Sequence, residues 1–95
     1  MATMAGAALI LAAAPAHADS RQGTTLCGSN GLNVRQTTDH YGDMTHTYVD
    51  VTGASPLLRR TFWQVGGKHT SYGFTNSSWT AVGGTIKSHS VTCAR

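Results

Sequence analysis

Apolar and β-branched residues alternate with polar residues in short runs along residues 19–95, and no stretch repeats apolar residues at helical spacing. Turn-forming residues separate these runs at intervals of roughly ten residues, the spacing of an antiparallel sandwich or barrel. We therefore predict an all-β fold, a small antiparallel β-sandwich or barrel of six or seven short strands. The predicted strands cover residues 23–27, 32–38, 44–52, 57–65, 69–75, 78–82 and 85–93.

The predicted turns contain Gly, Asn, Asp, Ser and Pro, several of which tolerate the positive φ angles of tight hairpins. The segment 39–43 around Gly42 is one such turn, and the Gly83-Gly84 pair is another. Each is expected to reverse the chain and to separate two strands. In the strand before the first of these turns, Leu32 and Val34 are predicted to face the core.

Residues 1–18 differ from the rest in being small and apolar, and they end in the tripeptide Ala16-His17-Ala18. Small residues at the last and third-last positions are those that signal peptidase requires, and the apolar run is shorter than the roughly 20 residues that cross a bilayer. We predict a secretory signal peptide, cleaved after Ala18, followed by a single β-domain over 19–95. A membrane-anchored or buried helix is the less favoured alternative, since Pro15 would break it. No basic residue precedes the run, which leaves open a start upstream of Met1.

The two cysteines, Cys27 and Cys93, stand near opposite ends of the predicted mature chain of 95 − 18 = 77 residues. A chain of this length builds a small core, and export would deliver the cysteines to an oxidising compartment. We predict a disulfide that points into the core and closes a loop of 93 − 27 = 66 residues. Such a loop is worth about 4 kcal/mol of stability. A metal-binding or redox-active thiol pair is less favoured, because no Cys-x-x-Cys spacing is present.

The chain carries seven basic and four acidic residues, a formal net charge of +3, and contains no Glu. A mildly basic surface favours acidic partners such as cell-wall polymers or anionic membranes. Nucleic-acid binding is not expected, because Arg59-Arg60 is the only adjacent basic pair. No other apolar stretch is long enough for stable membrane insertion of the mature chain.

Candidate catalytic groups are few. The only closely spaced carboxylates, Asp39 and Asp43, lie in a predicted turn, where Asp is common. No serine lies in a Gly-x-Ser-x-Gly elbow, which would mark the nucleophile of a hydrolase. A secreted ribonuclease often uses a Glu together with a His as general base and acid, and this sequence contains no Glu. We therefore expect a protein that is not an enzyme and that needs no cofactor.

Histidine is moderately abundant, and His40, Asp43 and His46 surround one predicted turn. Across a hairpin, two imidazoles can approach closely enough to bind zinc or copper. The spacing matches no recognised ligand pattern, so His40 and His46 are only weak metal candidates. The favoured interpretation is that they, with His69 and His89, are exposed residues of turns and strands.

Aromatic residues provide the best binding signal. Trp63 follows Arg59 and Arg60 on one predicted strand, and Trp79 is expected across a neighbouring hairpin. Together with Tyr41, they form a hypothetical aromatic and cationic patch for a protein or glycan partner. The alternative, that both Trp residues belong to the core, is the more favoured one.

Two stretches resemble known families of small secreted β-proteins. The segment 40–51, with His40-Tyr41-Gly42 and Thr45-His46-Thr47, is similar to the His- and Tyr-rich stretch of lactococcin-type bacteriocins, which act on cell-wall synthesis. The chain departs from that pattern in the early position of Cys27 and the long tail after Trp63.

The segment 80–95 resembles the end of the actinobacterial proteinaceous α-amylase inhibitors, which are six-stranded sandwiches. That family has two disulfides and an exposed Trp-Arg-Tyr turn, neither of which this sequence contains. No inhibitory residue can therefore be transferred to this chain.

These observations predict a secreted, extracellular binding protein of actinobacterial type whose partner is an extracellular protein or a cell-envelope component. An inhibitor of a secreted protein such as a hydrolase is the first hypothesis. A bacteriocin-like antibacterial factor and a structural cell-surface protein are the alternatives. The sequence does not indicate the oligomeric state.

Overall fold

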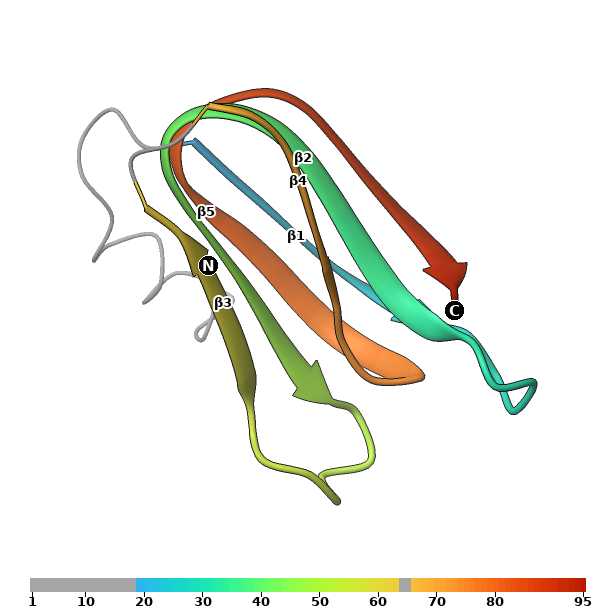
Figure 1. Ribbon diagram of the computed structural model, residues 1–95. Coiled ribbons are helices and arrows are strands. Elements are labelled where there is room, and N and C mark those ends of the chain that lie inside the picture. The colour runs from blue at the N-terminus through green and yellow to red at the C-terminus, as the bar shows by residue number, and fades with distance from the viewer. Residues whose placement is uncertain (1–18, 64–65) are drawn as a thin grey trace, which may run out of the picture.

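The computed structural model describes residues 19–63 and 66–95, and it confirms the all-β part of the predicted fold class (Figure 1). The predicted signal peptide, residues 1–18, lies outside the described residues. Within the described ranges, no helix is long and apolar enough to cross a membrane. The strands are β1 (Asp19–Leu26), β2 (Asn33–Asp50), β3 (Leu58–Phe62), β4 (Gly67–Tyr72) and β5 (Asn76–Ala94).

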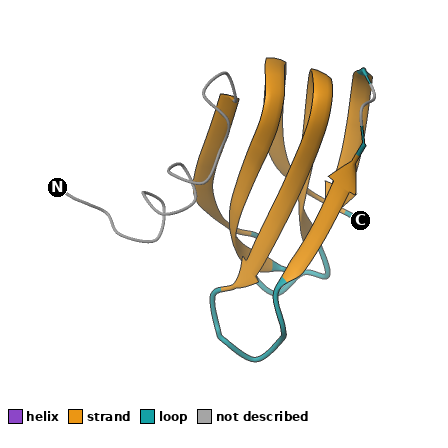
Figure 2. Ribbon diagram, turned by 90° about the vertical axis from the view of Figure 1, so that its left-hand side faces the viewer, coloured by secondary structure: helices purple, strands orange, loops and turns teal. Residues whose placement is uncertain are grey.

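These strands form one open antiparallel sheet in the order β1-β5-β2-β3, and β4 also pairs with β2. The central strands β2 and β5 are much longer than the others, with 18 and 19 residues. Figure 2 shows that strands make up most of the described chain, with loops at their ends. The described residues form five strands rather than the expected six or seven. The predicted strands 32–38 and 44–52 are both part of β2, and the predicted strands 78–82 and 85–93 are both part of β5.

Strands β2 and β5 bend over together at one end of the molecule (Figure 1). Their pairing shifts in register between Asp39 and His40 and again between Tyr41 and Met44. Before the bend, β2 pairs with β4 and with the later part of β5. After the bend, it pairs with β3 and with the earlier part of β5. We call these two parts the β4 half and the β3 half of the sheet.

The predicted turns at 39–43 and at Gly83-Gly84 are therefore wrong, since both segments stay within strands. Gly42 has a φ angle of 78°, which a glycine adopts without strain. Gly83 and Gly84 bring the two bent strands into close contact, because a Cβ on Gly83 would overlap the Asp43 carbonyl oxygen. The glycines thus allow a bulged bend of two paired strands rather than a chain reversal.

The interior lies between the two halves of the bent sheet. Alternate residues of β2 are buried on both sides of the bend, and they face this interior. Two apolar clusters occupy it. Cys27, Val34 and Tyr48 form the core of the first, and Met44, Ala81 and Ile86 form the core of the second.

The predicted Cys27–Cys93 disulfide is present, with 5.6 Å between the two Cα atoms. The bridge joins Cys27, the residue directly after β1, to Cys93 near the end of β5. There, Cys93 pairs with Val34 of β2. Cys27 is buried against Val34 and Tyr48, as predicted. Cys93 is opposite the fully buried Val34, so its side chain lies on the interior face of β5, although the residue itself is exposed at the sheet margin.

Candidate functional site

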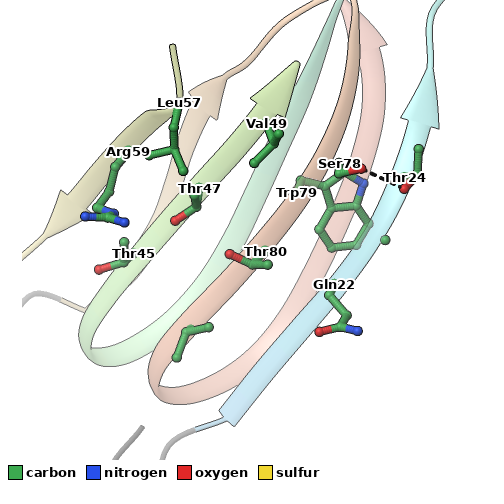
Figure 3. A pocket seen from close by; sticks show the side chains of 12 residues that line it. Gln22, Thr24, Thr45, Thr47, Val49, Leu57, Arg59, Ser78, Trp79 and Thr80 are labelled. Atoms are coloured by element: carbon green, nitrogen blue, oxygen red, sulfur yellow. Dashed lines mark hydrogen bonds between the residues drawn. The ribbon is translucent and has the colours of Figure 1, made fainter. Parts of the chain in front are cut away.

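A groove of about 730 Å³ hollows the outer face of the β3 half of the sheet (Figure 3). Its lining includes Thr45, Thr47 and Val49 of β2, which alternate with the buried residues of the same strand. The other three strands of this half complete the lining with Gln22, Gly23, Thr24, Ser78, Trp79, Thr80, Val82 and Arg59, and the loop before β3 adds Leu57.

The groove lining is rich in hydroxyl groups, and one end of the groove is apolar. Thr24 and Ser78 are joined by a hydrogen bond of 3.1 Å across β1 and β5 (Figure 3). At the other side, Val49 and Leu57 are 47% and 49% exposed, which is high for large apolar side chains. Among the described residues that line the groove, Arg59 is the single charged one. The groove can therefore offer hydrogen bonds, apolar contact and one positive charge.

Strand β3, at the edge of the sheet, is where the predicted binding residues concentrate. Arg59 and Arg60 are exposed on it, and Trp63, directly after its end, is 71% exposed. Arg59 faces the groove, whereas Arg60 lies 5.4 Å from the centre of the Phe62 ring, on the other face of the strand. The alternative placement of Trp63 in the core is wrong.

The other two predicted binding residues lie on different parts of the sheet. Trp79 lines the groove, but it also packs against the first core cluster and donates a hydrogen bond from Nε1 to Thr25 at 3.1 Å. Tyr41 is exposed at the bend, where Lys87 Nζ lies 4.8 Å from the centre of its ring. The structure therefore brings Arg59 and Trp79 to one groove, and it places Arg60, Trp63 and Tyr41 outside it.

The interior contains a hydrogen-bonded network that sequence reasoning missed. Ser71 Oγ of β4 lies 2.6 Å from both Tyr48 Oη and His46 Nδ1 of β2. Tyr48 Oη also lies 2.9 Å from the carbonyl oxygen of Ser71, and Thr38 Oγ1 lies 2.8 Å from His46 Nε2.

One proton arrangement satisfies every contact of this network. His46 Nδ1–H donates to Ser71 Oγ, whose own proton goes to Tyr48, and Tyr48 donates to the Ser71 carbonyl. Thr38 donates to His46 Nε2, which leaves His46 neutral. The network fastens the β3 half to the β4 half.

His46 is fully buried, and burial lowers its pKa to about 4, with smaller contributions from the positive charges of His89, His40 and His69. Burial also raises the pKa of Tyr48 and lowers that of His89. The pair of His46 and Ser71 resembles a catalytic dyad in its contact distance. A histidine with a pKa of about 4 and both ring nitrogens engaged is a weak general base at neutral pH, however. The arrangement serves structure better than catalysis.

His40, His69 and His89 also face the interior, since all three lie on strand positions opposite buried residues or are buried themselves. The expectation of exposed histidines is wrong for His40 and His46, which are fully buried. His40 Nδ1 donates to the Gly42 carbonyl at 2.9 Å, and its Nε2 lies 3.0 Å from His69 Nδ1. His89 Nε2 donates to Gln36 Oε1 at 2.9 Å.

The weak metal candidates His40 and His46 thus have different hydrogen-bond partners. No group of three His, Cys, Asp or Glu side chains that could hold a metal ion occurs in the described part of the chain.

Comparisons with protein-family models, with curated proteins and with solved structures find no match to this chain. The groove and the network are therefore interpreted from their own chemistry.

Proposed function

We propose that the chain is a small secreted, non-enzymatic binding protein that inhibits an extracellular protein such as a hydrolase by contact through the groove and strand β3. The observation that carries the proposal is the lining of the groove. It combines hydroxyl groups, exposed Val49 and Leu57, and Arg59, and its described lining residues include no carboxylate or imidazole. Such a surface suits binding rather than proton transfer.

The proposed contact surface combines features of protein interfaces. Large exposed apolar side chains on a soluble protein mark contact sites when they are grouped, and Trp and Arg are common anchors. Leu57 and Leu58 begin this group, and exposed Trp63 ends it. An edge strand such as β3 also presents backbone groups that a partner can pair with.

The bent sheet is suited to present such a surface rigidly. We propose that its two halves act as the two layers of a small sandwich, since the interior network and the Cys27–Cys93 bridge hold them together. The bridge is also the feature that supports secretion, because disulfides persist in oxidising compartments.

The test is capture by the immobilised mature chain, residues 19–95, from a mixture of secreted bacterial hydrolases. Thr47→Arg fills the groove, and Thr37→Arg is the matched control on the outer face of the β4 half of the same strand. We expect a hydrolase that the wild type and Thr37→Arg retain, that Thr47→Arg loses, and that the soluble chain inhibits at stoichiometric amounts.

Other outcomes would overturn the proposal. If Thr47→Arg and Thr37→Arg retained the hydrolase equally, the groove would not be part of the contact surface. Growth inhibition of related bacteria by the purified chain, with no hydrolase inhibited, would favour the bacteriocin-like alternative. Retention in the cell-wall fraction without either activity would favour a structural cell-surface protein.

A further inference from the structure

A second pocket, of about 290 Å³, opens between the edge strands β3 and β4. Its lining comes from three strands that are distant in the sequence. Tyr48 belongs to β2, Leu58, Arg59 and Arg60 belong to β3, and Thr70, Ser71 and Tyr72 belong to β4. We call it the seam pocket, because it lies where the two halves of the bent sheet stay open.

The charge of the seam pocket has one sign. Arg59 and Arg60 both line it, and none of its described lining residues carries a carboxylate. The guanidinium of Arg60 lies over the Phe62 ring, 5.4 Å from its centre, which restricts the side chain without neutralising its charge. Arg60 brings its guanidinium to the inner side of β3, whereas the Arg59 side chain points to the opposite face, where it lines the groove. A cation without a carboxylate among the described lining residues favours a negatively charged ligand.

Hydroxyl groups supply the rest of the polar lining. Tyr72 and Thr70 are exposed residues of β4. Ser71 and Tyr48 also line the pocket, but their hydroxyl protons are donated within the interior network, so Tyr72 and Thr70 are the hydroxyl groups that can face a ligand. A guanidinium binds two oxygens of one group in a bidentate manner, and hydroxyl groups can donate to a remaining oxygen. This combination matches an oxyanion.

We propose that the seam pocket is a binding site for an oxyanion group, a carboxylate, sulfate or phosphate, held chiefly by Arg60, with Arg59 adding positive charge from the other face of β3. The site is separate from the groove, although Arg59 lines both. The oxyanion can come from a free ion, from an acidic side chain or from a cell-wall polymer, and its chemistry is the same in each case.

The test is an NMR titration of the ¹⁵N-labelled mature chain at constant ionic strength, with sodium phosphate, sulfate and acetate in separate series against chloride. We expect saturable shifts at Arg60, Ser71 and Tyr72. Arg60→Gln weakens binding about tenfold or more, because a charge-assisted bidentate contact is lost. The matched control is Arg21→Gln on β1, whose arginine is exposed and outside the pocket.

Shifts that do not saturate, or that are equal in Arg60→Gln and Arg21→Gln, would overturn the proposal. If Arg60→Gln is unfolded, Arg59→Gln provides a second variant, since Arg59 is exposed. Saturation by phosphate and sulfate alone points to a free ion or a polymer, and saturation by acetate points to an acidic side chain. The titration contains no partner protein, so its failure and failure of the capture experiment are independent.

Discussion

Nδ1 of His46 lies 2.6 Å from Oγ of Ser71 and links the two halves of the bent sheet across the interior. His46 belongs to the β3 half, and Ser71 belongs to β4 in the other half. Because the same Ser71 oxygen also contacts Tyr48, one polar network does part of the work that apolar packing does in larger proteins. A buried network of this kind stabilises only while all its members are satisfied.

The stability of the fold should fall in mild acid because of His46. Its pKa is about 4 in the folded chain and 6.5 when exposed, so the unfolded chain binds more protons between these values. Stability is therefore retained above pH 6.5 and is lost as the pH falls toward 4, by about 3 kcal/mol in total for this group. The lowered pKa of His89 acts in the same direction. Urea unfolding at a series of pH values measures this loss.

The control for this prediction is His46→Gln. The variant is less stable at neutral pH, but its stability should depend less on pH between 6.5 and 4. An unchanged slope in His46→Gln would show that other groups cause the acid sensitivity.

Tyr48→Phe should destabilise the chain by about 1–3 kcal/mol, because the Gln36 amide and Ser71 lose a buried partner. For a domain of this size, that corresponds to a decrease in Tm of at least about 4 °C. Tyr72→Phe is the matched control, since Tyr72 is exposed on the outer side of β4. Equal Tm values for the two variants, measured by circular dichroism, would contradict the role of the network.

Reduction of Cys27–Cys93 should remove about 4 kcal/mol of stability, since the bridge closes a 66-residue loop. This is a large fraction of the stability of a small domain. The expected result is a much lower melting temperature in the presence of reductant, and the same decrease in a Cys27→Ser, Cys93→Ser double variant. Equal melting temperatures with and without reductant would show that the bridge contributes little.

Gly83→Ala should be one of the most damaging small substitutions, because its Cβ would overlap the main chain of Asp43 at the bend. Backbone cannot move aside as a side chain can, so we expect a loss of about 2 kcal/mol or more. Gly66→Ala is the matched control, since its Cβ would meet the Tyr41 ring edge at 3.3 Å and the His40 carbonyl oxygen at 3.5 Å, without overlapping the main chain. Denaturant midpoints measure both, and similar midpoints would argue against the close approach.

The sequence pattern predicts the strands well and the bend poorly, for a physical reason. Leu32 and Val34 belong to an alternating run that already indicates which face is buried. Gly42 and Gly83 also have local signals, but a turn and a bulged bend require the same residue type. Which of them forms depends on the pairing of β2 with β5, since Gly83 is opposite Met44. That register is set by contacts distant in the sequence.

In the candidate sites, too, some features could be predicted from the sequence and others depend on the fold. The predicted importance of Arg59, Arg60 and Trp63 depends on residue type alone, and the structure places all three on or beside one exposed edge strand. Thr47 and Val49 carry no distinctive signal, because their role in the groove arises only when four strands lie side by side. The sequence also does not indicate the role of Ser71 in the network, because that role depends on β4 lying across the interior from His46.

The most direct test of the groove as a contact surface is NMR mapping of ¹⁵N-labelled residues 19–95 with the captured hydrolase. The account predicts that the amides that shift or broaden are those of Thr45, Thr47, Val49 and Arg59, on the β3 half. Changes confined to Arg35, Thr37 and Thr70, on the outer face of the β4 half, would contradict it.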